Sequence, residues 1–261
     1  GLVHRQVTAD RAIDRGLVNS ISTAPACLSG CDLVILALPI PLLLDPPAEL
    51  LAAIPPAAVV TDVGSVKQPV LAAWRHRHPR FVASHPMAGT ALAGVEAGTP
   101  NLFCGRPWIA TPDGDTDPSA LATVKDLAVS LGSHWLTASA SQHDQAVALI
   151  SHMPVLVSAA LLRAVGDERD PEIRQLAAAL ASSGFADTSR VGGGNPDLGV
   201  AMASSNRDAV LRVLAAYRWS LEQLEDAVLQ ENWSQLHVEL KRTQALRPDF
   251  LQPLGDINAE N

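Results

Sequence analysis

The sequence predicts an α/β N-terminal domain built on a parallel sheet, followed by an all-α domain. Up to about residue 140, short apolar runs alternate with amphipathic segments, which is the order typical of strand–helix–strand units. Beyond that point the apolar residues recur at helical spacing instead. We therefore divide the chain into residues 1–140, residues 141–250 and a tail of residues 251–261.

Composition limits the class of protein. The chain has 261 residues, of which 48% are hydrophobic and 18% are charged, so it can bury a core in one large domain or two medium ones. The net charge of −8, without a long basic run, argues against binding to nucleic acid or to an anionic membrane surface. The three cysteines are odd in number and suit a reducing compartment. We find no apolar stretch of about 18 residues and no secretory signal, and therefore expect a cytoplasmic protein.

Six short runs are the expected strands of the first domain. They are Gly1–Arg5, Cys31–Leu38, Ala57–Thr61, Phe81–Ser84, Pro107–Thr111 and His134–Thr137. The second of them is almost continuously apolar, as expected for a strand buried on both faces of a parallel sheet. The expected helices between them are Ala9–Arg15, Leu42–Ile54, Lys67–His76 and Pro118–Leu131. Thr8 is the expected cap of the first helix and Gly16 its end, while Pro46 and Pro47 interrupt the second.

Polar or glycine-bearing loops follow three of these strands. They are His4-Arg5 after the first, Asp62–Ser65 after the third and His85 after the fourth. In a parallel sheet all three project from the same carboxyl edge, where open α/β sheets bind their ligands. This is a Rossmann-like, nucleotide-binding architecture. Pro86 biases His85 toward extended geometry, so we expect its imidazole at the end of a strand, facing a loop. The alternative is a surface histidine in a turn.

The glycine-rich phosphate loop of such domains, G-x-G-x-x-G after a first strand, is absent from the chain. Either the fold binds no dinucleotide, or its first strand, loop and helix precede residue 1. The abrupt start favours the second reading and an incomplete domain. Gly1–Arg5 is then the second strand, whose end meets the adenosine ribose. His4 and Arg5 stand there in place of an acidic residue, and a guanidinium pairs with a 2′-phosphate, which favours NADP over NAD. The alternative is a solvated arginine at a strand end.

Helical periodicity marks the second half. One apolar stripe contains Pro154, which removes a backbone donor and predicts a kink. Pro171–Ala181 is a second helix, Val210–Val228 carries a third apolar stripe, and Trp233 starts a last helix. Such a wide apolar surface suits either an oligomer interface or an ordinary helical core. We expect the tail from Arg247 onward to be loosely held.

Four side chains are further candidates for chemistry. His143 and His152 are nine residues apart, which places them on opposite faces of an α-helix and argues against a metal pair. His152 faces either the cleft between the domains or the core. Arg190, expected in a loop between helices, is either a clamp for a substrate carboxylate or a surface charge. Ser65 either hydrogen-bonds a ligand hydroxyl or caps a helix.

Four motifs together resemble the prephenate/arogenate dehydrogenases of tyrosine biosynthesis. Each motif is weak by itself, but their order and spacing match over nearly the whole chain. The resemblance is strongest to the cyanobacterial arogenate type, which shares the segment Ser189–Pro196. The motifs are Thr61–Lys67, His85–Thr90, His143-Asp144 with Ser151–Pro154, and Gly184–Arg190.

This resemblance implies an oxidative decarboxylation with hydride transfer to a nicotinamide, and a homodimer formed through the helical domain. His85 would accept the hydrogen bond and the proton of the substrate's C4 hydroxyl, a role that suits an imidazole because its usual pKa is about 6.5. Ser65 would orient the same hydroxyl. The residues implied to bind the substrate are Arg190, His152 and Thr90. Those implied to bind the cofactor are His4, Arg5, Thr8, Leu38, Pro39, Ile40 and Gly64.

Two departures from the family pattern bear on the substrate. Prephenate-using members often carry Glu after the threonine of the histidine motif, where this chain has Ala91, and His in the helix motif, where it has Val155. Prephenate has a pyruvyl side chain and arogenate an amino acid one, and the loss of both polar groups favours arogenate. A prephenate-accepting or dual-specificity enzyme is one alternative. A non-catalytic dimerisation or binding module is another, because the phosphate loop is absent.

Overall fold

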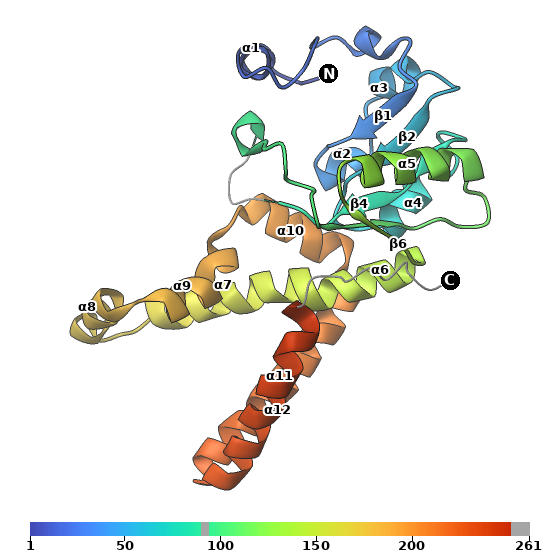
Figure 1. Ribbon diagram of the computed structural model, residues 1–261. Coiled ribbons are helices and arrows are strands. Elements are labelled where there is room, and N and C mark those ends of the chain that lie inside the picture. The colour runs from blue at the N-terminus through green and yellow to red at the C-terminus, as the bar shows by residue number, and fades with distance from the viewer. Residues whose placement is uncertain (90–93, 252–261) are drawn as a thin grey trace.

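The computed structural model describes residues 1–89 and 94–251. Figure 1 shows an α/β part above a set of long helices, with helix α6 (Ala140–Val147) passing beneath the strands. The order of the elements confirms the predicted fold class, a Rossmann-like domain followed by an all-α region.

Three short strands form a parallel sheet. They are β1 (Leu33–Leu36), β2 (Val59–Asp62) and β3 (Phe81–Val82), in the order β1-β2-β3, and the last residues of β1 and β2 lie opposite each other. β2 is buried along its whole length, as expected for a strand covered on both faces. The helices between the strands are α2 (Ile40–Leu44), α3 (Ala48–Ala53) and α4 (Gln68–Trp74). The break between α2 and α3 falls at the two prolines, as predicted.

The prediction of a single strand over Phe81–Ser84 is wrong. The chain leaves β3 at Ala83 and enters a second strand, β4 (Ser84–Pro86), which pairs antiparallel with β5 (Pro107–Ala110). His85 therefore lies inside a strand, opposite Ile109, and not in the loop after a strand.

The strands β4 and β5 belong to a second sheet, separate from the parallel one. This second sheet is mixed because of the connection between β4 and β5. A parallel return needs a crossover, usually a helix. Within its described residues this connection holds a four-residue 3₁₀ helix, Gly94–Ala97, and no α-helix. The next connection contains α5 (Pro118–Ser130), and there β6 (His134–Thr137) pairs parallel with β5 as predicted.

The predicted first strand, Gly1–Arg5, is also wrong. It forms a single bridge between Leu2 and Ser22. A strand needs a paired neighbour for its backbone groups, and this segment meets only a loop.

Helix α1 spans Gln6–Asp14 and starts before the predicted helix. Thr8 thus lies within the first turn and is not the cap. Arg5 is the N-cap residue, and α1 has neither a side-chain cap nor an acidic residue in its first turn. Gly16, with φ +64°, follows the end of the helix as predicted, in the left-handed conformation that glycine adopts without strain.

Trp74 fixes α4 against the parallel sheet. Its ring stacks on Phe81 with the centroids 5.1 Å apart, and its Nε1 donates to the carbonyl of Leu43 at 2.8 Å. The ring is fully buried and its polar atom is satisfied, so these contacts join α4, β3 and α2 into one core. The start of α4 is thereby held beside the end of β2.

The helical part begins with a capping box formed by Ser139 and Gln142. Helix α6 continues through a π-helical turn, η3 (Ala148–His152), into α7 (Met153–Gly166). The kink predicted at Pro154 takes the form of this turn, because the wider hydrogen-bonding pattern accommodates a proline that cannot donate.

By length and composition the run Ala140–Gly166 could cross a membrane, with a mean hydropathy of 1.8. Our expectation that no such stretch exists is therefore wrong, because small residues lengthen the apolar run. The same run carries His143, Asp144 and His152, whose side chains are buried against neighbouring elements.

The remaining elements are α8 (Pro171–Leu180), α9 (Ser183–Ser189), η4 (Arg190–Gly193), α10 (Pro196–Ser205), α11 (Arg207–Leu229) and α12 (Trp233–Leu251). Arg190 follows α9 directly and opens the 3₁₀ helix η4, so the loop predicted there is wrong. The reason is packing on α7, where Ser158 Oγ accepts the Gly192 N–H at 2.9 Å and donates to the carbonyl of Thr188.

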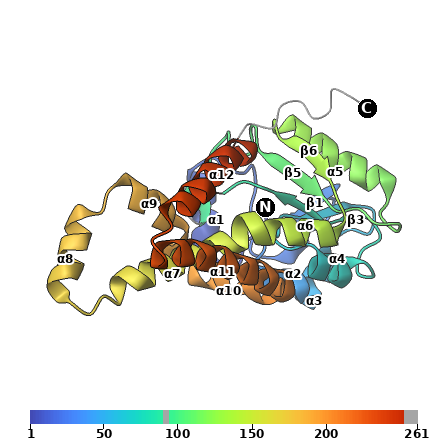
Figure 2. The ribbon, with the colours of Figure 1, turned by 90° about the horizontal axis from the view of Figure 1, so that it is seen from below.

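Helices α11 and α12 pack on each other. Figure 1 shows them projecting away from the α/β part, and Figure 2 views the molecule from below. This packing extends α12 past Arg247, where we expected a loose tail, to Leu251; residues 252–261 lie outside the described residues. At the start of the stripe Val210–Val228, Val210 is buried, whereas Leu221 farther along is 50% exposed. Other exposed apolar side chains of this pair are Trp219, Leu229, Trp233, Val238 and Leu240.

Candidate active site

His85 lies at the centre of the candidate site, where the α/β part meets α6. Its Nδ1 is 3.0 Å from Nε2 of His143, and the two rings meet edge to face. Antiparallel pairing with β5 fixes the backbone of His85, and Pro86 after it favours the extended conformation. The imidazole is half-buried at the seam between the two parts of the chain.

His143 in turn contacts a buried carboxylate. Its Nδ1 is 2.7 Å from Oδ1 of Asp144, and both side chains are almost completely buried. Asp144 also accepts the backbone N–H groups of Lys67 and Gln68, at 2.7 and 2.8 Å. These donors stand at the start of α4, where the helix dipole favours a negative charge. The Asp144 carboxylate thus joins α6 to the start of α4. It also stands at the end of a row formed by His85, His143 and Asp144.

A second buried carboxylate lies behind His85. Asp62 forms an ion pair with Lys67, and both side chains are fully buried. Asp62 also accepts the N–H groups of Gly64 and Ser84, at 2.8 and 3.1 Å, while Lys67 Nζ donates to the carbonyl of Ser84 at 2.7 Å. Burial lowers the pKa of Lys67, and the charge of Asp62 opposes that change.

Gly64 is required by this packing. A Cβ built on it would lie 2.8 Å from Leu43 Cδ1 and 2.9 Å from Asp62 Oδ2. Glycine therefore lets the backbone pass close to the buried carboxylate. This packing role exists whether or not Gly64 also touches a cofactor, as the motif suggests.

The environment keeps the imidazole of His85 neutral. Its pKa is well below the usual value because the ring is buried, and the charge of Lys67 and the nearby His143 and His152 add to this effect. A neutral imidazole has one nitrogen with a free lone pair, which is the form that can accept a proton.

His152 is also directed to the site. Its Nδ1 is 3.2 Å from the side-chain nitrogen of Asn206, which also donates to the backbone carbonyl of Asp144 at 2.7 Å. Burial lowers the pKa of His152, and the Asp144 carboxylate opposes this. A π-helical turn lies between His143 and His152, so the 100° per residue that placed them on opposite faces does not apply over this stretch.

Two buried polar atoms of the site have no hydrogen-bond partner among the described residues. They are Nε2 of His152 and Oγ of Ser65, and the backbone of Ser65 approaches His152 without meeting the geometry of a hydrogen bond. Since Nδ1 of His152 accepts from the Asn206 amide, Nε2 of that ring carries the hydrogen. A donor and a hydroxyl left unpaired in this way mark a place for polar groups of a ligand.

The remaining predicted residues fall in three places. Leu38, Pro39 and Ile40 follow β1 at the sheet edge where Gly64 follows β2. His4 and Arg5 are exposed at the start of α1, away from the histidines. Arg190 is exposed at the start of η4, and no ion pair to it occurs within residues 1–89 and 94–251. Thr90 and Ala91 lie outside the described residues.

Sequence reasoning missed the roles of four side chains: Asp62, Lys67, Asp144 and Asn206. We quoted the first three only as parts of motifs, and weighed His143 only as a metal ligand. The signal available for Asp144 was an adjacent His-Asp pair just inside a capped helix. No comparable signal exists for Asn206, which is distant in sequence.

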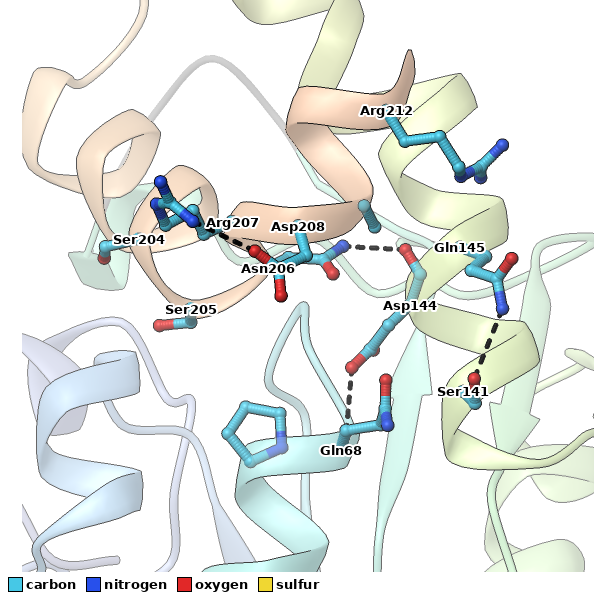
Figure 3. A pocket seen from close by; sticks show the side chains of 12 residues that line it. Gln68, Ser141, Asp144, Gln145, Ser204, Ser205, Asn206, Arg207, Asp208 and Arg212 are labelled. Carbon is cyan, nitrogen blue, oxygen red and sulfur yellow. Dashed lines mark hydrogen bonds and ion pairs between the residues drawn. The ribbon is translucent and has the colours of Figure 1, made fainter. Parts of the chain in front are cut away.

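A groove of about 570 Å³ adjoins the site on the other side of Asp144. Figure 3 shows the Asp144 side chain between Gln68 and Asn206, with Arg212 farther along the wall. The groove shares Asp144 and Asn206 with the histidine cluster but is not lined by His85. His85, the predicted catalytic residue, therefore lies outside this groove.

Two family models match the chain. The nucleotide-binding domain of prephenate dehydrogenase matches residues 1–137, and its dimerization domain matches residues 139–242. A cyclohexadienyl dehydrogenase from Zymomonas mobilis is 31% identical over 83% of this chain and 74% of its own length. A prephenate dehydrogenase from Bacillus subtilis is 29% identical, and this chain spans 55% of its length.

Solved structures agree with these matches. The Synechocystis arogenate dehydrogenase is 40% identical, with a TM-score of 0.77 over 96% of this chain and 90% of its own. The prephenate dehydrogenase of Aquifex aeolicus, solved with hydroxyphenyl propionate and NAD+, is 27% identical, with a TM-score of 0.88 over 96% and 88% of the two chains. The chain therefore belongs to the prephenate dehydrogenase family, as a nucleotide-binding domain followed by a dimerisation domain.

Proposed function

We propose that this protein oxidatively decarboxylates arogenate to tyrosine with NADP as the hydride acceptor. The observation that carries the proposal is the site around His85, which combines a neutral imidazole with two buried polar atoms that have no hydrogen-bond partner among the described residues, Ser65 Oγ and His152 Nε2. The first can receive a proton, and the other two can hold a polar substrate in place.

His85 acts as the general base toward the C4 hydroxyl of the substrate. When bound, the nicotinamide would accept the hydride from C4 while CO2 leaves C1 and the ring becomes aromatic. The proton that His85 takes from the hydroxyl returns to the phenolate oxygen, so the imidazole is regenerated within one turnover. Ser65 Oγ orients the same hydroxyl, and the Nε2–H of His152 donates to an oxygen of the substrate.

The fit to a dinucleotide rests on the carboxyl edge of the parallel sheet. Leu38, Pro39 and Ile40 would flank the nicotinamide, and Gly64 gives its backbone close access at the neighbouring strand end. NADP is favoured at the other end by Arg5, which occupies the N-cap position of α1, where the N–H groups at the helix start also suit a phosphate. His4 and Thr8 stand beside it in the sequence.

The preference for arogenate is supported by Val155 and Ala91 and by the identity to the Synechocystis arogenate dehydrogenase. Thr90 and Arg190 complete the proposed substrate site, Arg190 as the clamp for a carboxylate. Because Arg190 is exposed in the single chain, this assignment rests on its motif alone.

A homodimer is supported by the match to a dimerisation domain and by the exposed apolar side chains of α11 and α12. The polar contacts of His143, Asp144 and His152 with neighbouring elements support a helix that packs inside the protein and does not cross a membrane. On that basis we keep the expectation of a cytoplasmic enzyme.

The test is a steady-state assay of the full-length protein with arogenate and prephenate, each with NADP and NAD. We expect the highest kcat/KM with arogenate and NADP. An equal or higher value with prephenate would overturn the choice of substrate, and a higher value with NAD would overturn the choice of cofactor. Absence of turnover in all four combinations would favour a non-catalytic binding module.

A further inference from the structure

Two side chains that are each only 2% exposed, Asp144 and His143, form a row that ends in a contact between His143 and His85. Asp144 Oδ1 is 2.7 Å from His143 Nδ1, and His143 Nε2 is 3.0 Å from His85 Nδ1. We propose that these two are positioning residues, which hold His85 in the one tautomer whose Nε2 is free to accept a proton. The inference rests on the proposed role of His85 as the base.

The proton positions follow from the carboxylate. Asp144 receives backbone N–H groups on both oxygens, so it acts as an acceptor only. The Nδ1 that faces it on His143 must therefore carry hydrogen. In a neutral ring the Nε2 of His143 then has the lone pair, and it accepts from Nδ1–H of His85. The remaining nitrogen of His85, Nε2, is left without a hydrogen.

The opposite tautomer of His85 would be inactive. Its Nε2–H would donate toward the substrate hydroxyl and could not take the proton, and its bare Nδ1 would face the bare Nε2 of His143. The direction of the hydrogen bonds from His85 to His143 and from His143 to Asp144 thus selects one tautomer of His85. Nothing in this selection requires His143 or Asp144 to touch the substrate.

A purely structural role for the pair is the competing explanation. Asp144 joins α6 to the start of α4, and Asn206 Nδ2 donates to its backbone carbonyl, so its loss would also loosen the seam. Variants at His143 separate the two roles because they leave Asp144 and its contacts to α4 in place.

The experiment compares His143→Ala and His143→Gln in the full-length protein. Glutamine places its amide near the position of the histidine Nε2, so its oxygen can accept from His85, whereas alanine provides no acceptor. His76→Ala is the matched control, because His76 is exposed in the turn that follows α4. The first readout is ¹⁵N NMR of the His85 imidazole without substrate, and the second is kcat with arogenate.

We expect the wild type, the control and His143→Gln to show His85 protonated at Nδ1, and His143→Ala to show a mixture of tautomers. We expect kcat to fall by about 10²-fold in His143→Ala and by less than about 10-fold in His143→Gln. An unchanged His85 tautomer in His143→Ala, or equal losses of kcat in both variants, would overturn the positioning role. The NMR result needs no turnover, so failure of the proposed function would appear separately, as an inactive wild type with the expected tautomer.

Discussion

Replacing Lys67 by methionine tests the buried ion pair behind His85. Methionine keeps most of the side-chain volume but removes the charge, which leaves the fully buried Asp62 carboxylate without its cation. Breaking a buried pair from one side costs about 3–5 kcal/mol. Asp62 still accepts the N–H groups of Gly64 and Ser84, so we place Lys67→Met at the low end, about 3 kcal/mol of unfolding free energy.

The assay is equilibrium urea unfolding at neutral pH, followed by circular dichroism. Lys125→Met is the matched control, since Lys125 is exposed on α5 and its loss should change stability by no more than about 0.5 kcal/mol. The double variant with Asp62→Asn carries no unpaired charge and should be more stable than Lys67→Met alone, with a coupling energy above about 1 kcal/mol. A cost below about 1 kcal/mol for Lys67→Met would refute the reasoning, as would additivity in the double variant.

The substitution Lys67→Met should also change the pKa of His85, the proposed base. The charge of Lys67 helps to lower the pKa of His85, so its removal raises that pKa. The acid limb of the kcat/KM profile of Lys67→Met should therefore move to higher pH than in the wild type. A shift to lower pH would contradict the assignment of that limb to His85.

Three further predictions follow from the site. His85→Asn should lower kcat by about 10²–10⁴-fold without a change in melting temperature, and near-normal turnover would remove His85 from the role of base. Gly64→Ala should cost about 1–3 kcal/mol in urea unfolding, because its Cβ would meet Leu43 and Asp62, whereas Gly114→Ala, with nothing within 4 Å, serves as the control. The free energy of unfolding should fall as the pH drops from 7.5 to 5.5. The reason is that the pKa of both His85 and His152 is lowered in the folded state. Below about pH 6.5 the unfolded chain therefore binds more protons than the folded one. Glutamine at both positions should flatten this pH dependence, and an unchanged slope would contradict it.

The sequence determined the fold class because the local spacing of apolar residues indicates which segments form strands and which form helices. The run Ala57–Thr61 specifies a buried strand, the two prolines after Asp45 break a helix, and the change of period near residue 140 marks the helical part. The motif around His85 likewise pointed to the residue that lies at the centre of the candidate site.

Tertiary structure decided what those local signals leave open. Whether β4 runs parallel or antiparallel depends on which strand it meets, and the relative directions of His143 and His152 depend on a π-turn formed to accommodate Pro154. The contact of Asp144 with Lys67 joins residues far apart in the chain, and a pairing of this kind exists only once two elements pack. The sequence by itself therefore determined the fold class and the family motifs, while packing alone decided how Asp144 and His143 line up behind His85.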